Sequence, residues 1–202
     1  MARLPDFKRS FEYENNFYLS CDSSRTAKIL AHYELLKMTF NIPGHIVACG
    51  VSPCDSLSRS AMFRELFMNR FAKKIVVFDA FKTVGEGFSK KDIRKTLERK
   101  GVFHNIDLVA GDMAETAPRY LRDNAQTKIS FLDLNTSTRI STFTALENFY
   151  SRLSRNGILL TNDEIPVQTR AVRDYFKNSK KVLLRLPFCT TLSYIVKKNW
   201  PA

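Results

Sequence analysis

Two aspartates end or closely follow apolar runs of the kind that form buried strands. Asp79 ends the run at residues 74–79, and Asp112 comes two residues after the run at 106–110. In an open parallel sheet, ligands bind at the carboxyl ends of strands, where a carboxylate can accept hydrogen bonds from ribose hydroxyls. We expect this role for Asp79, and we expect Asp112 to receive an adenine amino group while Met113 packs on the ring. For both aspartates the alternative is a solvated loop position or a helix cap.

The turn after the first apolar run, residues 46–51, offers further contacts to the same ligand. Gly50 lets the backbone come close to a bound molecule, and Cys49 and Val51 flank it. Ser56 begins a helix, and the free N–H groups at a helix N-terminus favour an anion. We therefore include these four residues in the expected cofactor site, together with Asp133 at the end of the fourth apolar run.

Polar residues also follow the next two apolar runs. Alternation puts Asp133 and Asn135 on one face at the end of the fourth run, and Asn162 and Asp163 come directly after the fifth. The carboxyl ends of neighbouring parallel strands meet at one edge of a sheet, so we expect these groups to converge. If the reaction needs a base, Asp163 or Asp133 is the better candidate. The histidines are expected to be structural: His32, His45 and His104.

The elements that must position these residues alternate between apolar runs and helical stretches. Such alternation predicts an α/β fold with a mainly parallel sheet and helices on both faces. The expected strands are 46–51, 74–79, 106–110, 128–134, 157–161, 182–186 and 191–196. The expected helices are 25–40, 56–71, 115–123, 141–153 and 169–178, with a further loop and polar helix within 85–100. The last two strands form an antiparallel hairpin, which completes the seven-stranded Rossmann-like layout of class I methyltransferases.

The length, net charge and cysteine spacing of the chain limit the class of protein. A length of 202 residues suits one domain, which we expect at residues 25–202, preceded by an aromatic-rich arm at 1–24 that packs on it. The net charge of +12 favours acidic partners, although scattered basic residues also fit simple solubility. We expect no membrane span, because no run reaches the roughly 18 apolar residues that one needs. The four cysteines form no C-x-x-C pair and the N-terminus lacks a signal-peptide core, which predicts a cytoplasmic protein.

A family resemblance becomes visible once these segments are read in order. The chain resembles the macrocin O-methyltransferase-like (TylF-like) family from about Phe11 to Phe176. The stretches that carry the resemblance are FEYENNFYL (11–19), PGHIVACGV (43–51), FDAF (78–81), GD (111–112), ALENFY (145–150), NGILLTND (156–163) and TRAV (169–172), followed by Asp174 and Phe176. It implies transfer of a methyl group from S-adenosylmethionine to a sugar hydroxyl, assisted by a divalent metal.

The resemblance also places a metal site, and the sequence departs from it there. The family has an Asp-x-Asp strand end, which falls on Asn135 and Ser137, and an Asp-Asp pair, which falls on Asn162 and Asp163. Asp133, two residues before Asn135, could supply the missing carboxylate. Because hard divalent cations prefer carboxylates, we expect Mg²⁺ binding to be weak or absent. Two departures concern the cofactor: Ala48 stands where the family has an acid, and Cys54 where it has a glycine.

Three functions remain open at this point. The first is methyl transfer to a small hydroxylated acceptor such as a sugar, and the positive charge suits an acceptor that carries phosphate. The second is a degenerate member that binds the cofactor or a partner without transferring a methyl group. The third is a nucleic-acid methyltransferase or binder, for which we find no dense basic stripe. The aromatic arm could also contact a second subunit, so a homo-oligomer remains open.

Overall fold

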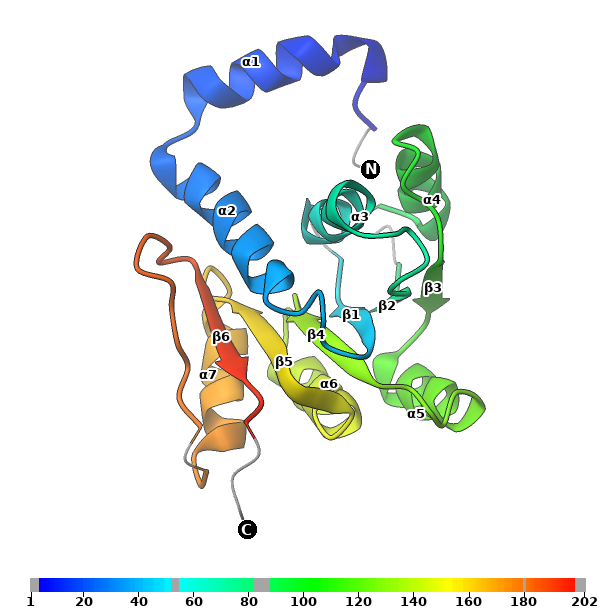
Figure 1. Ribbon diagram of the computed structural model, residues 1–202, viewed down its shortest axis with the longest axis vertical. Helices are drawn as coiled ribbons and strands as arrows, with labels where there is room; N and C mark the ends of the chain where they lie inside the picture. Colours follow the sequence, from blue (N-terminus) through cyan, green and yellow to red (C-terminus); the bar gives the residue numbers. More distant parts are fainter. Residues whose placement is uncertain (1–3, 52–54, 82–87, 180, 199–202) are drawn as a thin grey trace.

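One mixed sheet forms the centre of the molecule. The computed structural model describes residues 4–51, 55–81, 88–179 and 181–198 (Figure 1). In these ranges six strands lie in the order β3-β2-β1-β4-β5-β6, and all neighbours are parallel except the antiparallel pair β5–β6. The strands are β1 His45–Cys49, β2 Ile75–Asp79, β3 Ile106–Ala110, β4 Ile129–Leu134, β5 Leu153–Asn162 and β6 Leu192–Val196. The expected α/β fold with a mainly parallel sheet is confirmed.

Helices cover both faces of this sheet because alternate strand residues are apolar on each side. Ile46 and Ala48 of β1 belong to one core, and Val47 and Cys49 belong to the other. The first core is closed by α2 Ser23–Lys37, α3 Asp55–Phe67 and α4 Lys90–Arg99. The second core is closed by α5 Met113–Asp123, α6 Arg139–Phe149 and α7 Pro166–Phe176.

The expected strand at residues 182–186 is wrong, so the described sheet has six strands and not seven. Only Leu184 pairs there, through two backbone hydrogen bonds of 2.8 and 2.9 Å with Tyr194 of β6. Val182 and Leu184 are 67% and 43% exposed. Because these side chains are not buried, little apolar packing holds the segment along the sheet edge.

Because of local capping, the helices begin and end a few residues away from the expected positions. The helix expected from Arg25, with Ser23 or Ser24 as its cap, begins at Ser23 because the Asp22 carboxylate accepts a hydrogen bond from the Ser24 N–H at 2.9 Å. The helix expected at 141–153 is α6, which begins after the capping hydroxyl of Thr138. Its expected last residues lie in a turn and in β5.

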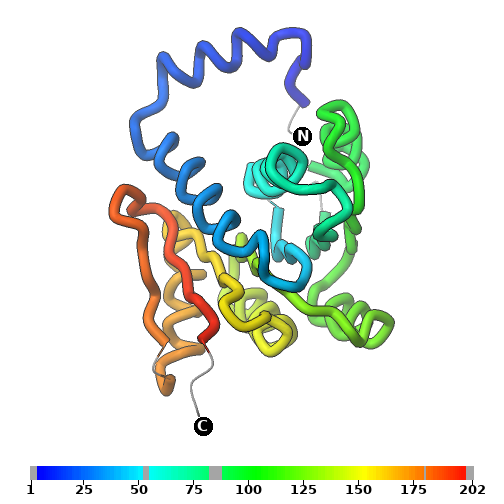
Figure 2. The backbone as a smooth tube through the Cα atoms, in the orientation of Figure 1, coloured from blue at the N-terminus to red at the C-terminus, as the bar shows by residue number. Residues whose placement is uncertain are grey.

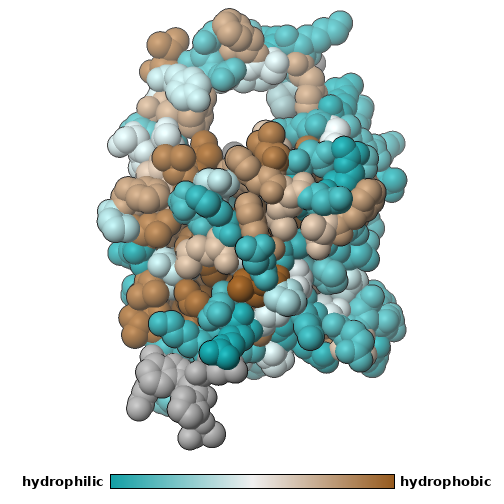
Figure 3. Space-filling view, viewed as in Figure 1, coloured by the Kyte–Doolittle hydropathy of each residue, from teal (hydrophilic) through white to brown (hydrophobic). Residues whose placement is uncertain are grey.

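The N-terminal arm is helical and stands away from the sheet. It contains a 3₁₀ turn, η1 Phe7–Arg9, and the helix α1 Ser10–Ser20, neither of which has a buried residue. Figure 2 shows the arm arching over α2 and α3, and Figure 3 shows an opening beneath it. Its first turn contacts the domain, where the Arg99 guanidinium lies 5.0 Å from the centre of the Phe7 ring. The expected packing of the arm on the domain is therefore seen at its first turn, whereas α1 has no buried residue.

Two expected features lie outside the described residues: Cys54 and most of the loop before α4, residues 82–87. Of the helices that are described, none is long and apolar enough to cross a membrane.

Candidate functional site

A cavity of about 720 Å³ opens at the carboxyl edge of the sheet. It brings together five of the residues expected at the cofactor and metal sites: Gly50, Asp79, Asp112, Met113 and Asn135. They come from the ends of β1, β2, β3 and β4, as the strand order requires. The far wall is formed by residues that the sequence did not single out: Thr136, Thr138, Ile140, Ser141, Thr144 and Ile165.

Gly50 is required where β1 leaves the sheet. Its φ of +86° is a conformation that side chains rarely adopt, and a Cβ there would lie 2.3 Å from the carbonyl oxygen of Asn135. The backbone is held in this close approach on two sides. The Gly50 N–H donates to the Phe78 carbonyl, and the Asn135 N–H donates to the Cys49 carbonyl, both at 2.8 Å. The first strand end is thereby tied to its neighbours β2 and β4.

Asp79 is oriented by two backbone donors, one from the turn after β1 and one from the turn after β2. One carboxylate oxygen accepts a hydrogen bond from the Val51 N–H at 3.0 Å, and the other accepts one from the Phe81 N–H at 2.5 Å. A carboxylate has about four acceptor positions, so each oxygen can take a further donor. The side chain is half-buried and lines the cavity. Asp79 can therefore receive hydroxyl groups from a ligand while it stays fixed.

Asp112 is both a helix cap and part of the cavity lining. One of its carboxylate oxygens accepts a hydrogen bond from the Ala114 N–H at 2.9 Å at the start of α5. The capping alternative is thus present, and the second oxygen has no partner among the described hydrogen bonds. Met113 follows it and lines the same cavity. The turn before them contains Gly111, whose φ is +134°.

Asp133 is buried behind the cavity and has only neutral hydrogen-bond donors. The Ser56 hydroxyl at the start of α3 donates to its carboxylate, and the Asn135 amide donates at 3.0 Å. Burial raises the pKa of Asp133 to about 6, although both hydrogen bonds act in the opposite direction. Burial and the nearby Asp133 raise the pKa of the Cys49 thiol well above its usual range. In the parallel register, Asp133 lies beside Ala48 of β1.

The residues expected to bind a metal are engaged in other contacts. The Asn135 amide donates to Asp133, and the Asn162 amide oxygen accepts the Glu164 N–H at 3.1 Å. Asp163 is 8% exposed, and its carboxylate accepts hydrogen bonds from three side chains: Thr169 at 3.0 Å, Arg185 at 2.9 Å and Ser193 at 2.5 Å. These donors use the acceptor positions that a cation would need. The present arrangement therefore does not fit Mg²⁺.

Among the described residues, no three His, Cys, Asp or Glu side chains come together in a group that could hold a metal ion. The ends of β4 and β5 are joined instead by a buried amide. The Gln168 side-chain oxygen accepts from the Thr161 hydroxyl and the Asn162 N–H, both at 2.8 Å, and its nitrogen donates to the Thr136 carbonyl at 3.2 Å.

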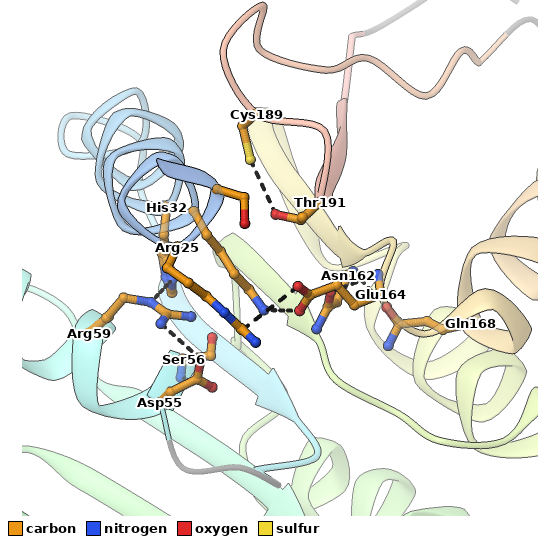
Figure 4. A network of polar contacts seen from close by, with 12 residues as sticks. Arg25, His32, Asp55, Ser56, Arg59, Asn162, Glu164, Gln168, Cys189 and Thr191 are labelled. Atoms are coloured by element: carbon orange, nitrogen blue, oxygen red, sulfur yellow. Dashed lines mark hydrogen bonds and ion pairs between the residues drawn. The ribbon is translucent and has the colours of Figure 1, made fainter. Parts of the chain in front are cut away.

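Charged side chains that the sequence did not reveal converge beside this edge, between α2, α3 and the end of β5 (Figure 4). Lys28 is buried, and its ammonium lies 2.6 Å from the Glu164 carboxylate, with Arg25 3.8 Å from the same carboxylate. On α3, which faces α2 in this view, Arg59 contacts Asp55 at 2.9 Å. Glu164 directly follows the polar pair Asn162 and Asp163 in the sequence, whereas nothing in the sequence marked Arg25, Lys28 or Arg59. Only the packing of α2 against the end of β5 brings Lys28 and Glu164 together.

His32 lies within the same cluster and is structural, as expected. The Arg59 N–H donates to its Nδ1 at 3.1 Å, which places the imidazole proton on Nε2, 3.0 Å from the Ser60 hydroxyl. The ring stacks on Phe131, with centroids 5.7 Å apart. Burial, with Arg59 and Lys28 nearby, lowers the pKa of His32 to about 3, so the ring is neutral.

Comparison with known proteins identifies the fold. No family model and no curated protein matches the sequence. CalS11, a calicheamicin methyltransferase, is similar in structure, with a TM-score of 0.77 and 22% identity over 95% of this chain and 87% of that one. Its apo structure, described as a TDP-rhamnose 3'-O-methyltransferase, gives a TM-score of 0.76 and 24% identity over 93% of this chain and 86% of that one.

Two further O-methyltransferases share the fold. NovP has a TM-score of 0.70 and 16% identity, covering 85% of this chain and 80% of that one. An O-methyltransferase from Bacillus cereus in complex with SAH has a TM-score of 0.62 and 12% identity, covering 96% of this chain and 93% of that one. The chain therefore has the fold of the class I O-methyltransferases.

Proposed function

We propose that this protein is an S-adenosylmethionine-dependent methyltransferase. The observation that carries the proposal is the cavity at the carboxyl edge, where Gly50, Asp79, Asp112 and Met113 meet. Ligands of open α/β sheets bind at this edge, and the four residues provide a close backbone approach, two carboxylates and an apolar side chain. The SAH complex of the structurally similar Bacillus cereus O-methyltransferase supports the choice of cofactor.

The described residues fit the cofactor by their chemistry. Asp79 would accept the ribose hydroxyls, because its backbone donors leave acceptor positions on both oxygens. Asp112 would accept the adenine amino group with the oxygen that does not cap α5, and Met113 would pack on the ring. When bound, S-adenosylmethionine supplies an electrophilic methyl group on a positively charged sulfur. The chain would contribute alignment and the exclusion of water.

We further propose that the acceptor is a small hydroxylated molecule such as a sugar. The structural likeness to CalS11, a TDP-rhamnose 3'-O-methyltransferase, supports an acceptor of this class. The net charge of +12 suits an acceptor that carries phosphate. The contacts of Asn135, Asn162 and Asp163 favour a reaction without Mg²⁺.

Calorimetric titration with S-adenosylmethionine and SAH tests the cofactor proposal. We expect micromolar binding that does not change when Mg²⁺ is added. Asp79→Ala should weaken binding by about 2 kcal/mol, roughly thirtyfold, because two hydroxyl groups lose a charged acceptor. Asp123→Ala is the matched control, since Asp123 is exposed at the far end of α5 and does not line the cavity. No binding by the wild type would rule out the proposal.

The second candidate function is cofactor binding without methyl transfer, and the contacts of one expected base, Asp163, favour it. The Asp163 carboxylate is held by Arg185 and Ser193, so it is poorly placed to accept a proton from an acceptor. A protein that binds the cofactor without transferring a methyl group would show the same calorimetric result. A screen of sugars and nucleotide-linked sugars with labelled cofactor separates the two, because only a methyltransferase gives labelled product.

A further inference from the structure

A groove of about 460 Å³ lies at the amino ends of the strands, on the edge of the sheet opposite the proposed cofactor cavity. It is lined by residues at or just before the starts of β1, β4 and β5. Three cationic side chains line it, those of Lys128, Arg152 and Arg155, and no acidic residue of the described chain does. We call this site the basic groove.

Two of these cations have no partner in the described part of the chain. The side chains of Lys128 and Arg155 are exposed, and neither takes part there in a hydrogen bond, an ion pair or a ring contact. Arg152 donates one N–H to the Ala125 carbonyl at 2.6 Å, which holds the guanidinium beside the groove and leaves its other donors open. The groove therefore presents positive charge that no carboxylate within it neutralises.

The positive charge continues beyond the groove through Lys197. Its ammonium lies 2.9 Å from the Ser151 carbonyl and 2.7 Å from the Leu153 carbonyl, and both residues line the groove. The same ammonium lies 5.4 Å from the centre of the Tyr150 ring, and the ammonium of Lys181 lies 5.6 Å from that ring. Burial, with Lys181 nearby, lowers the pKa of Lys197. The carbonyl contacts hold Lys197 in place, but the two neighbouring ammonium groups repel each other, and a bound anion would relieve that repulsion.

We propose that the basic groove binds the phosphate backbone of a nucleic acid. Each nucleotide brings one negative charge, so a strand can neutralise cations that are spread along a surface, from Lys128 and Arg155 to Lys197 and Lys181. The lining of the groove includes no aromatic side chain on which a base could stack. We therefore expect contacts to phosphates, which do not depend on the base sequence.

A membrane surface fits the groove less well. Surfaces that bind at a lipid interface insert apolar side chains below the headgroups. None of the large apolar residues that are exposed in the described chain lines the groove. The inference does not rest on the proposed methyl transfer, since the groove lies at the other edge of the sheet.

Fluorescence anisotropy with a labelled single-stranded RNA of about 20 nucleotides, longer than a typical site, tests the proposal. Affinity would be measured between about 50 and 200 mM salt. Lys128→Gln/Arg155→Gln should weaken binding about tenfold or more at the lower salt. It should also make the slope of log affinity against log salt shallower by about 1.4, because each phosphate contact of a single strand contributes about 0.7.

Lys91→Gln/Lys95→Gln is the matched control. Both lysines are exposed on α4, neither has a side-chain partner in the described part of the chain, and the substitution removes the same two positive charges. RNA affinity should stay within about threefold of the wild type, since charges away from the bound strand are screened by salt. An equal loss in both variants would show that net charge alone attracts the RNA, and it would overturn the proposal. Absence of wild-type binding at the lower salt would overturn it as well.

Co-sedimentation with vesicles that contain phosphatidylserine distinguishes the other anionic partner. Binding to the vesicles without binding to the RNA would overturn the proposal. Thermal unfolding checks the fold of both variants, whose midpoints should lie within about 2 °C of the wild type because the replaced side chains are exposed. The affinity of Lys128→Gln/Arg155→Gln for S-adenosylmethionine should stay within about twofold, because distant sites act independently. RNA binding and cofactor binding can therefore each fail without the other.

Discussion

Two aspartates of the site differ in what surrounds them. Asp79 is half-buried and accepts hydrogen bonds from two backbone N–H groups, which leave acceptor positions on both oxygens for a ligand. Asp133 is 2% exposed and is bonded to a hydroxyl and an amide. Burial raises the pKa of Asp133, because it disfavours the charge more than the two neutral donors favour it.

This difference predicts a pH-dependent contribution of Asp133 to stability. Burial raises its pKa from 3.8 to about 6, so the folded state binds the proton more tightly than the unfolded chain. The contribution is full below pH 3.8 and is lost as the pH rises through 6, a change of roughly 3 kcal/mol. Urea unfolding between pH 4 and pH 7.5 should show this loss in the wild type and not in Asp133→Asn. Asp123→Asn is the exposed control, and parallel curves for wild type and Asp133→Asn would contradict the prediction.

At the scale of the elements, buried polar side chains tie helices to strand ends. Gln168 of α7 joins the ends of β4 and β5. Arg64 of α3 is fully buried, and its guanidinium donates to the carbonyl groups of Lys73, Asn105, Val102 and His104. These carbonyls belong to the segments that lead into β2 and β3, so Arg64 fixes the end of the sheet opposite the cavity.

Arg64→Met should therefore destabilise the domain strongly. The substitution keeps most of the side-chain volume but leaves several carbonyl groups without a donor, which we expect to cost about 3 kcal/mol or more. The free energy of unfolding in urea measures the effect. Arg94→Met is the matched control, because Arg94 is 61% exposed and its contacts are at the surface: an ion pair with Glu98 and the ring of Phe103, whose centre lies 5.0 Å from the guanidinium. Exposed contacts of this kind are each worth about 1 kcal/mol or less. Similar losses in both variants would contradict this role for Arg64.

At the scale of the whole molecule, the arm and the domain differ in how they are held. Both cores lie between the sheet and helices α2 to α7, and no residue of η1 or α1 is buried. Exposed apolar side chains on α1 include Phe11, Tyr18 and Leu19, at 74%, 68% and 86%. The arm thus contributes little apolar burial to the fold of the single chain.

Removal of residues 1–20 should accordingly leave the domain folded. We expect the midpoint of thermal unfolding to fall by no more than about 3 °C, because the main losses are the exposed contacts of α1 and the contact between Phe7 and Arg99. Sedimentation of the full and shortened chains would also report whether the arm joins two copies. A large fall in the midpoint without a change of mass would show that the arm stabilises its own domain.

The sequence by itself determined the order of the elements and which strand ends lie around the cavity. Apolar runs broken by helical stretches specify a parallel sheet, and the residue at each strand end then lies at one edge whatever the details of packing. This is why Gly50, Asp79, Asp112 and Met113 could be predicted together, and the structure brings them to one cavity. The strand expected at 182–186 failed because apolar composition alone does not tell whether side chains will be buried.

Only the tertiary structure decided which polar groups have charged partners. Lys28 and Glu164 are 136 residues apart, and Ser56 and Asp133 are 77 apart. Such pairs form because helices α2 and α3 pack over the carboxyl ends of the strands, and no local pattern encodes that packing. The segment between α7 and β6 brings Arg185 to Asp163, and Asp133 is buried beneath the start of α3. The type and spacing of a side chain show which kinds of chemistry are open to it. Its partners and its burial decide which of those kinds it can perform.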